Sequence, residues 1–353
     1  MLRSMDSAVS GLRAHQNKLD VIGHNIANVN TNGFKAQNYT FKDTMYQTST
    51  ASTNGTNTAG GVNAAQYGYG ALMGVISMDM TASTPTYKGG FNATIDGDGF
   101  FITKSTKVAN MVVKGENDED VLKGNDLAFT RVGQFSIDSN GYITDGNGNF
   151  VYGFREGSAP AANGGKKLEP LRVPTQGSIT IDQNGVAHVG AWSGTAANGS
   201  PVTGQEISDV TGVGTAYEAL DIQINKMGDI QVTLKVKYQV TDGQTPPTLT
   251  DKEDTFTVTM GQVAIATFQN QDGLTKDGSG YYTATSRDNT GACSAAAPGD
   301  GRSTLMPGYL EASNVDMATE FSEMIMTQRG FQANSKIITV SDEILNDLIN
   351  MKR

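Results

Sequence analysis

One stretch of the sequence has the residue types and spacing of a calcium-binding loop. Four oxygen-bearing side chains fall at positions 1, 3, 5 and 12 of the EF-hand pattern: Asp145, Asn147, Asn149 and Glu156. Position 6 is Phe150, although the pattern needs glycine there for its sharp turn. The flanking residues have the pattern of strands rather than helices. The stretch is therefore either a weak calcium candidate or an Asn/Gly-rich β-turn.

The remaining reactive side chains form no catalytic pattern. His15, His24 and His188 are scattered, and none has a second histidine four residues on, as a helical zinc site requires. The glycine-rich stretch 68–74 lacks the spacing of the dinucleotide fingerprint, and neither a P-loop nor a G-x-S-x-G motif occurs. We therefore expect no catalytic residue, no cofactor and no metal beyond the weak calcium candidate. The protein is not expected to be an enzyme.

Composition narrows the possible partners. The chain has 353 residues, 42 glycines, one tryptophan and a net charge of −10. Its length suits two or three domains. Apart from the doublet Lys166–Lys167 no basic cluster occurs, which argues against binding to nucleic acid or to an acidic membrane surface. Cys293 is the single cysteine, so the chain forms no internal disulfide.

Hydropathy predicts neither membrane insertion nor a cleaved secretory signal. No run of 18 apolar residues occurs, which is the minimum expected for a membrane-spanning helix. The first twenty residues carry Arg3, Asp6 and Arg13 and no continuous apolar segment. Either a cytoplasmic protein or one exported by another route is consistent with this pattern.

The first segment has the spacing of a long amphipathic helix. Residues alternately three and four apart form a stripe that is apolar except for one histidine: Met5, Ala8, Leu12, His15, Leu19, Ile22, Ile26 and Val29. The spacing predicts a helix of roughly 27 residues, about 40 Å long, with a coiled-coil-like seam. We expect Asn32–Gly33 to end it, because glycine enters the left-handed region at little cost.

The last segment repeats this pattern. Its predicted seam has seven apolar members among ten: Met317, Phe321, Met324, Gln328, Phe331, Ser335, Ile338, Asp342, Leu345 and Ile349. Ser313 and Asp316 have the spacing of a capping box, which predicts the helix start. The pattern predicts a helix of roughly 35 residues. All nine prolines lie between Pro85 and Pro307, so neither terminal helix is interrupted.

The two seams are narrow, and each helix is too long to lie against a small domain. Ordering such helices costs conformational entropy along their whole length. We therefore expect them to be loosely ordered in a free monomer and firm when other copies pack around them. The alternative is an ordinary helix pair within one chain.

The middle of the chain is predicted to be β-rich. Residues 229–240 alternate strictly between apolar and polar side chains, and residues 255–260 do the same, as half-buried antiparallel strands do. Asn140–Gly141 and Asn184–Gly185 lie between apolar runs and predict hairpin turns. Residues 48–64 form a low-complexity tract, which indicates a linker or an extended arm.

The two ends resemble a known protein family. "LDVIGHNIANVNTNGFK" (Leu19–Lys35) resembles the N-terminal signature of bacterial flagellar rod and hook proteins, and "GYLEASNVDMATEFSEMIMTQRGFQANSKIITVSDEILNDLI" (Gly308–Ile349) resembles their C-terminal signature. Weaker similarity continues inward through Ile95–Ile102, Phe129–Ile143 and Ile265–Ala292. The residues that carry the signature are Asn25, Ala27, Asn28, Gly33, Phe34, Ser313, Asn314 and Val315. His24 departs from the family, where many members have asparagine.

The resemblance implies a mixed, multidomain fold in which two nested β-rich domains lie between terminal helices. It implies a coiled-coil-like inner domain made of residues 1–47, with the first helix and its exit segment, and of residues 307–353. Residues 48–70 would be a linker. An inner β domain would comprise 71–155 and 262–306, and an outer β domain 156–261 would be inserted in it. The helix residues expected to hold subunits together are Met5, Leu12, Leu19, Ile22, Ile26, Met317, Phe321, Met324, Phe331, Ile338 and Leu345.

The resemblance further implies a structural subunit of the flagellar hook, a curved tube that transmits motor torque to the filament. Its implied partners are other copies of itself in a helical homopolymer, the rod and hook–filament junction proteins, the hook cap and the flagellar type III export apparatus. Phe41 and Met45 match the family's weak export motif, although they could simply pack the exit segment. The implied location is extracellular, in the hook and basal body, without signal cleavage.

Two other functions remain open. The nearer is a subunit of the distal rod, which is straight and rigid. Rod proteins of this type generally lack a large insert, whereas roughly 100 residues separate the inner β motifs here, between Glu156 and Gly261. The second is a secreted β-rich binding module, or a glycan-acting enzyme that would need paired carboxylates in a cleft.

Overall fold

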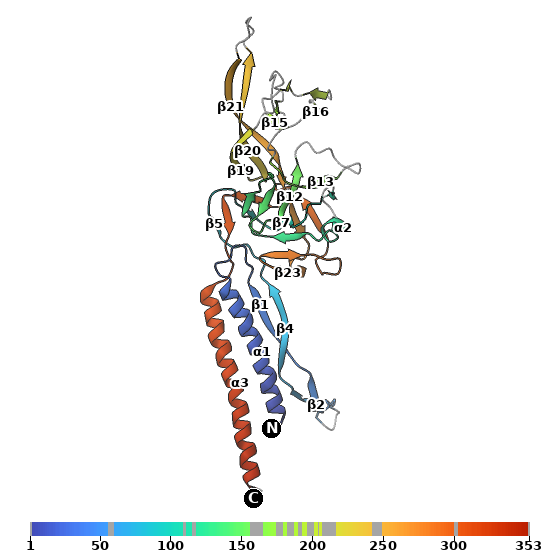
Figure 1. Cartoon of the computed structure of the whole chain (residues 1–353). Helices are drawn as coiled ribbons and strands as arrows, with labels where there is room; N and C mark the ends of the chain where they lie inside the picture. Colours follow the sequence, from blue (N-terminus) through green and yellow to red (C-terminus); the bar gives the residue numbers. More distant parts are fainter. Residues whose placement is uncertain are drawn as a thin grey trace. The chain divides into compact units, whose positions relative to one another are not determined.

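The computed structural model describes most of the chain in detail. The described residues are 2–55, 60–108, 111–114, 118–155, 165–173, 179–181, 187–189, 193–195, 201–203, 205–206, 217–241, 249–299 and 303–351. The chain forms two compact units, one of residues 1–81 with 313–353 and one of residues 82–312. As predicted, a long helix at each end flanks a β-rich middle (Figure 1).

The first unit contains two long helices and four strands. They are α1 (Leu2–Ala27), β1 (Gln37–Asp43), β2 (Tyr46–Thr50), β3 (Ala65–Gly68), β4 (Ala71–Met78) and α3 (Met317–Met351). The lengths, 26 residues for α1 and 35 for α3, agree with the sequence periodicity. However, α1 ends at Ala27, so Val29 lies beyond the helix and follows it in a turn.

The two helices lie side by side and run antiparallel (Figure 1). A Cβ added to Gly11 would meet Asn334, and one added to Gly330 would meet His15. Lys18 forms a salt bridge of 3.0 Å with Glu323. Residue numbers therefore rise along α1 as they fall along α3.

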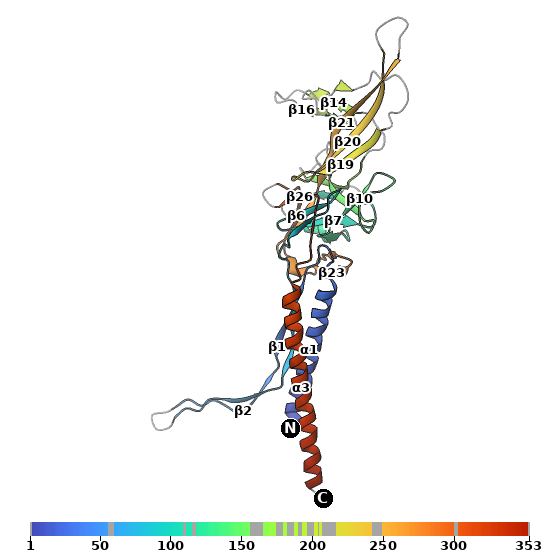
Figure 2. The ribbon, with the colours of Figure 1, turned by 90° about the vertical axis from the view of Figure 1, so that its left-hand side faces the viewer.

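Antiparallel strands β1 and β4 pack against α1, and β2 pairs with β3. The β2–β3 pair falls in the tract that the sequence assigned mainly to a linker, and every residue of both strands is exposed. Figure 2 shows this pair leaving the helices of its unit as a slender arm. Isolated two-stranded ribbons are marginally stable in water.

The second unit contains the remaining elements. They are β5 (Pro85–Tyr87), β6 (Ala93–Asp96), β7 (Phe100–Lys104), β8 (Met111–Val113), α2 (Glu119–Leu122), β9 (Ala128–Thr130), β10 (Phe135–Ile137), β11 (Ile143–Asp145), β12 (Phe150–Arg155), β13 (Lys166–Pro170), β14 (Ile179–Ile181), β15 (Ala187–Val189), β16 (Ser193–Thr195), β17 (Pro201–Thr203), β18 (Gln205–Glu206), β19 (Tyr217–Ile224), β20 (Asp229–Thr241), β21 (Leu249–Val263), β22 (Ile265–Phe268), the 3-10 helix η1 (Gln271–Gly273), β23 (Thr275–Gly278), β24 (Tyr281–Thr283), β25 (Cys293–Ala296), β26 (Thr304–Pro307) and β27 (Tyr309–Glu311).

The predicted strands and one predicted hairpin are present in this unit. Strand β20 pairs with β21 from Asp229 to Thr241, and β12 in turn pairs with β21. Ile230 and Val232 are buried, as their alternation predicts. Gly141 has a φ of 81° between the paired strands β10 and β11. The hairpin predicted at Asn184–Gly185 lies outside the described residues.

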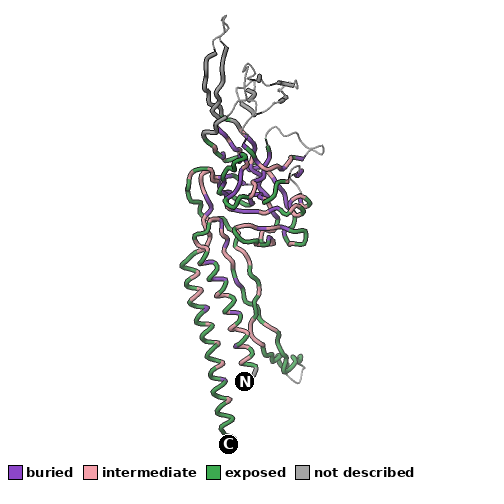
Figure 3. Tube along the Cα trace, in the orientation of Figure 1, coloured by how far each residue is buried: buried purple, intermediate pink, exposed green. Residues whose placement is uncertain are grey.

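The core of the second unit lies where its sheets meet. Buried residues are coloured purple in Figure 3, and one cluster of buried apolar residues contains Ala93, Ile95, Phe101, Phe135, Ile143, Val151, Leu171, Val173, Ile224, Ile230, Val232, Met260, Val263, Ile265 and Leu305. Members come from both predicted β domains, including Phe101 from the inner one and Val232 from the outer one. The division into two nested β domains stays a prediction.

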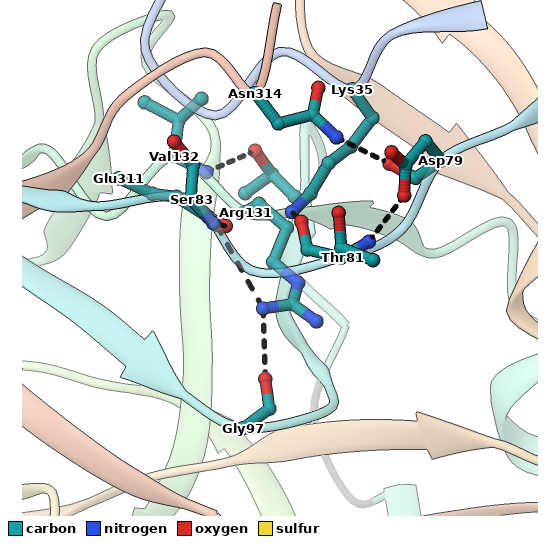
Figure 4. A network of polar contacts seen from close by, with 10 residues as sticks. Lys35, Asp79, Thr81, Ser83, Gly97, Arg131, Val132, Glu311 and Asn314 are labelled. Carbon is teal, nitrogen blue, oxygen red and sulfur yellow. Dashed lines mark hydrogen bonds and ion pairs between the residues drawn. The ribbon is translucent and has the colours of Figure 1, made fainter.

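The first and last strands of this unit in the sequence pair with one another. Residues 304–307 of β26 pair with β6, and residues 309–311 of β27 pair with β5. Beside β27, the buried Arg131 guanidinium lies 3.8 Å from the Glu311 carboxylate and donates a hydrogen bond of 3.0 Å to the Gly97 carbonyl (Figure 4). Burial lowers the pKa of Arg131, and the nearby Glu311 carboxylate opposes this. The Glu311 carboxylate therefore stabilises the positive charge of the buried Arg131.

We expect Glu311→Gln to destabilise the second unit by about 3 kcal/mol, because the buried guanidinium would lose its counter-charge. Chemical denaturation followed by tyrosine and tryptophan fluorescence measures the change. Asp277→Asn, at an exposed position, is the matched control and should cost little. Equal losses for the two variants would contradict this role of Glu311.

Candidate interaction surface

Asn25 lies near the end of α1 and is 1% exposed. Its Nδ2 donates to the Gln37 carbonyl and to Glu320 Oε1, both at 2.9 Å. Its Oδ1 accepts a hydrogen bond of 2.9 Å from the Gln37 backbone amide. One amide side chain thus connects α1, the first residue of β1 and the first turns of α3.

The chain turns sharply between α1 and β1. Gly33 has a φ of 68°, the left-handed conformation that glycine adopts without strain. Asn28 Nδ2 donates 2.9 Å to the His24 carbonyl at the helix end, and its Oδ1 accepts from Thr31. The Phe34 ring stacks edge-on against His24, with centroids 5.5 Å apart. Phe34 thus packs back onto the last turn of α1, whose final residue, Ala27, is exposed.

Asn314 joins the exit segment to the residues before α3. Its Oδ1 accepts 2.7 Å from the Ala36 amide, and its Nδ2 donates 2.8 Å to the Asp79 carbonyl (Figure 4). Lys35 is fully buried, and its Nζ donates 2.7 Å to the Thr81 carbonyl. The sequence analysis missed the buried role of Lys35, since lysine is rarely buried unless paired.

The start of α3 differs from the predicted capping box. Asp316 itself caps the helix: its Oδ1 accepts 3.0 Å from the Ala318 amide, and its Oδ2 accepts from the Thr319 hydroxyl. These bonds, chiefly the one from Thr319, lower the pKa of Asp316. Ser313 Oγ instead accepts a 3.4 Å bond from the Val315 amide in the approach to the helix. Aspartate displaces the predicted arrangement because it is a strong N-cap residue.

The helix interface is smaller and more polar than predicted. On α3 the least exposed residues are Glu320, Glu323, Met324, Thr327, Gly330, Asn334, Ile338, Ser341 and Leu345. Thr327 Oγ1 and Ser341 Oγ are buried but donate to the carbonyls four residues earlier, at 2.7 and 2.8 Å. Their burial therefore leaves no hydroxyl unsatisfied. Gly11 and Gly330 have no side chain, which lets the two helices approach closely.

The predicted α3 seam coincides only in part with the residues that face α1, and its role in subunit contacts stays a prediction. Met324, Ile338 and Leu345 are half-buried, but Met317, Phe321, Phe331 and Ile349 are exposed, as are the polar members Gln328, Ser335 and Asp342. The α1-facing residues are mostly three or four residues apart, but at several turns they lie one position before the predicted seam. Periodicity gives the spacing of a stripe, whereas apolarity does not predict that Thr327 and Ser341 face α1.

On α1 the predicted seam matches the burial better. Ile22 is buried, and Met5, Leu12, Leu19 and Ile26 are half-buried. A second buried row, which the sequence analysis missed, contains Ala14, Val21 and Asn25. These residues line clefts shared with β4 and β1 or bond to β1 directly. Their spacing of seven and four residues places them on one face of a helix, so the sequence contained a signal for this second row.

His15 lies where α1, α3 and β1 meet. A Cβ at Gly330 would lie 2.7 Å from its ring, and the Phe41 ring centroid is 5.2 Å away. Its Nδ1 is buried without a hydrogen-bond partner. Burial, and then the Lys18 charge, lower the pKa of His15 below 6.5.

Two apolar stripes of α3 are left uncovered. The first contains Met317, Phe321 and Ile325, and the second contains Ile337, Val340, Ile344, Leu348 and Met351. Phe321 follows Glu320 of the interface and Ile337 precedes Ile338, so the stripes lie on opposite sides of the α1-facing residues. Exposed contiguous apolar surface of this kind marks interaction sites.

Phe41 and Met45 lie in different environments. Phe41, on β1, is 43% exposed, stacks against His15 and Tyr39, and lies under the Lys18 ammonium group. Met45, between β1 and β2, is 83% exposed. Phe41 therefore has a packing role of its own, whereas Met45 has a side chain open to contact.

The calcium-loop candidate forms a turn between β11 and β12. Asp145 Oδ1 accepts from the Asn147 and Asn149 amides at 3.0 and 2.9 Å, and Oδ2 accepts from the Tyr281 hydroxyl. Burial, and then the bond to Asp145, raise the pKa of Tyr281 to about 12. A cation would have to displace these donors, so the geometry favours the β-turn. Glu156 lies outside the described residues.

Among the described residues, no cluster of three or more histidine, cysteine or acidic side chains has the arrangement of a metal site. In the same part of the chain, no helix is both long and apolar enough to cross a membrane.

Comparison with known proteins supplies the family. The family model "Flagella basal body rod protein" matches residues 5–35, and "Flagellar basal body rod FlgEFG protein C-terminal" matches residues 306–351. The flagellar basal-body rod protein FlgG of Bacillus subtilis is 35% identical over 356 positions, covering 100% of each chain. The flagellar hook protein FlgE of Borreliella burgdorferi is 27% identical over 470 positions, again covering 100% of each.

A crystal structure of the Helicobacter pylori flagellar hook protein FlgE2 is also similar, with a TM-score of 0.34 and 12% identity. The matched region covers 66% of this chain and 100% of that one.

We expect Asn25→Asp to destabilise the helix pair by about 2 kcal/mol, because both donors to Gln37 and Glu320 are lost and a second carboxylate is placed beside Glu320. Hydrogen exchange of the α1 and α3 amides measures this. Asn17→Asp, at an exposed position of α1, should change exchange little. The loss should shrink below about pH 5, where the carboxyl groups take up protons. A pH-independent loss would argue against the contact with Glu320.

We expect the α1–α3 pair to weaken as the pH falls from 7.5 to 5.5. The folded-state pKa of His15 lies below its unfolded value, so the unfolded chain binds the proton more tightly and stability is lost as protons are added. His15→Gln should flatten this part of the profile, followed by helical circular dichroism in mild denaturant. His24→Gln, at an exposed position, should leave the profile of the parent protein unchanged.

Proposed function

The chain belongs to the flagellar rod and hook protein family, and we propose that it is the structural subunit of the flagellar hook. Its similarity to members of the family extends over its whole length. In this proposal the protein carries out no catalysis. It polymerises into a curved tube that transmits motor torque to the filament.

The observation that carries the proposal is the uncovered apolar surface of the helical unit. Ile344, Leu348 and Met351 are 44%, 48% and 83% exposed on one stripe of α3 alone. Burying one large aliphatic side chain is worth roughly 1.5–3 kcal/mol, so such a row favours association strongly. In a homopolymer, each copy can cover the apolar row of its neighbour with the same complementary surface.

The architecture suits a flexible tube. In the proposed assembly the terminal helices form a coiled-coil-like inner layer that gives axial continuity. Residues 71–155 with 262–306 form an inner β domain, and the insert 156–261 forms an outer one. The outer surfaces slide against neighbours as the tube turns, because interfaces with few large apolar anchors reorganise at small cost.

The proposed partners and location follow from the same assignment. Other copies of the chain form the tube, while rod proteins, hook–filament junction proteins and a hook cap contact its ends. The subunit reaches the cell exterior through the flagellar type III export apparatus without signal cleavage. Met45, 83% exposed beside β1, is available for the export contact together with the partly exposed Phe41.

A subunit of the distal rod is the second candidate, and a specific observation favours it. The relative of 35% identity is named a rod protein, and its alignment spans 356 positions, close to the 353 residues of this chain. The alignment with the hook protein spans 470 positions, so that relative carries more than one hundred residues that this chain lacks. Insert length alone therefore separates the two functions less sharply than the sequence analysis expected.

Immunogold electron microscopy of isolated flagella separates the two candidates. We expect antibody against residues 156–261 to label the short curved segment between rod and filament. Label on the straight rod alone would identify the rod subunit instead. Label on neither structure would contradict both assignments. Flagella from a strain lacking this protein are the control for antibody specificity.

A further inference from the structure

Helix α3 extends past the end of its partner helix. Gly11 lies opposite Asn334 and His15 opposite Gly330, so the antiparallel register pairs Leu2 with Glu343. The described residues from Ile344 to Met351 therefore continue beyond the start of α1 by about 12 Å, at 1.5 Å per residue. Figure 1 shows this overhang within the helical unit.

The overhang, defined as residues 344–351, carries large apolar side chains and one carboxylate. Leu345 at its start is half-buried, whereas the apolar side chains at positions 344, 348, 349 and 351 are exposed, with Ile349 at 65%. Asp347 lies within it, and Asp342 and Glu343 immediately precede it. Among the described residues these three carboxylates form no ion pair within 4.0 Å.

A groove on another side of the same unit has complementary features. It lies between α1 and β4 and has a volume of about 380 Å³. Its lining residues are Asp6, Val9, Ser10, Arg13, Ala14, Asn17, Ala71, Leu72 and Met73. Leu72 and Met73 are about half exposed, at 54% and 50%. Arg13 at its rim is exposed.

The overhang of the same chain does not occupy this groove. The α1 residues that line it, such as Val9 and Arg13, are on a different face of the helix from Gly11 and His15, which contact α3. Because α3 is one continuous helix to Met351, its last turns continue along the axis and away from the groove.

We propose that the overhang of α3 binds in the α1–β4 groove of a second copy of this chain, with Leu348 as an apolar anchor and Asp347 facing Arg13. This inference rests on the proposed homopolymer and names its contact surfaces. The two surfaces are different parts of one unit, so the contact is head-to-tail. A head-to-tail contact adds copy after copy, and it gives an open helical assembly when its rotation does not close into a ring.

Cysteine crosslinking tests the contact in the assembled polymer. In a Cys293→Ala background, Met73→Cys and Leu348→Cys are combined in one chain, which is polymerised and oxidised. Disulfides need the two Cβ atoms within about 4 Å, so bonding reports direct contact. We expect a ladder of covalent oligomers on a denaturing gel. A mixture of the two single-cysteine chains should stop at covalent dimers.

The matched control moves one cysteine along the same strand. Val75, on β4, is 64% exposed but does not line the groove. Val75→Cys with Leu348→Cys should therefore give no ladder. The proposal would be overturned if polymers of the Met73→Cys/Leu348→Cys variant ran only as single chains on the denaturing gel after oxidation, or if their disulfides formed only within one chain. If the unmodified protein forms no polymer, the proposed function fails instead.

Charge exchange gives an independent test. Arg13→Glu and Asp347→Arg should each raise the concentration needed for polymerisation by roughly five-fold, the effect expected for one partly exposed ion pair. The double variant should return to within about two-fold of the parent, because the pair is restored with reversed sign. Additive losses in the double variant would overturn the contact. Circular dichroism of each monomer shows whether the helices are retained.

Discussion

The first unit depends on one buried amide. Asn25 satisfies both backbone groups of Gln37 and one carboxylate oxygen of Glu320, which is 295 residues away in sequence. A hydrophobic side chain of similar size would leave the Gln37 amide and carbonyl buried without partners, at a cost of about 1–3 kcal/mol. This bond set fixes where the chain leaves α1 and which turn of α3 lies beside it. The register of the whole helix pair follows from that point.

Several contacts near Asn25 restrict the conformation of the segment between α1 and β1. Gly33 supplies the left-handed turn, and Asn314 then bonds to both Ala36 and Asp79. Lys35 closes the segment by bonding to Thr81. Polar side chains supplement the backbone bonds here because residues 34–36 lie outside any helix or strand, and buried amide and carbonyl groups must be satisfied. The family signature thus includes residues of direct structural use, notably Asn25, Gly33 and Asn314.

Local patterns in the sequence predicted the elements well. The alternation of three and four residues gave both helices and the 35-residue length of α3, and the period of two gave β20 and part of β21. The same patterns failed where burial depends on a distant partner. Thr327 faces α1 because Gly11 and Gly330 bring the helices close, a condition that spacing along α3 does not reveal. The buried Lys35 and the Arg131–Glu311 pair likewise depend on groups far away in the chain.

The distribution of side chains on α3 has a consequence for assembly. Its α1-facing side carries Thr327, Gly330 and Ser341, which allow close contact but bury little apolar area. Most of its large aliphatic side chains point elsewhere, along both flanks and into the overhang. The pair within one chain therefore sets geometry, whereas most of the apolar surface remains for contacts outside it. We therefore expect the helical unit of an isolated chain to be marginally stable and to gain stability when further copies cover the flanks. Folding of the helices would then be coupled to assembly, because binding of a partner to the folded state stabilises it.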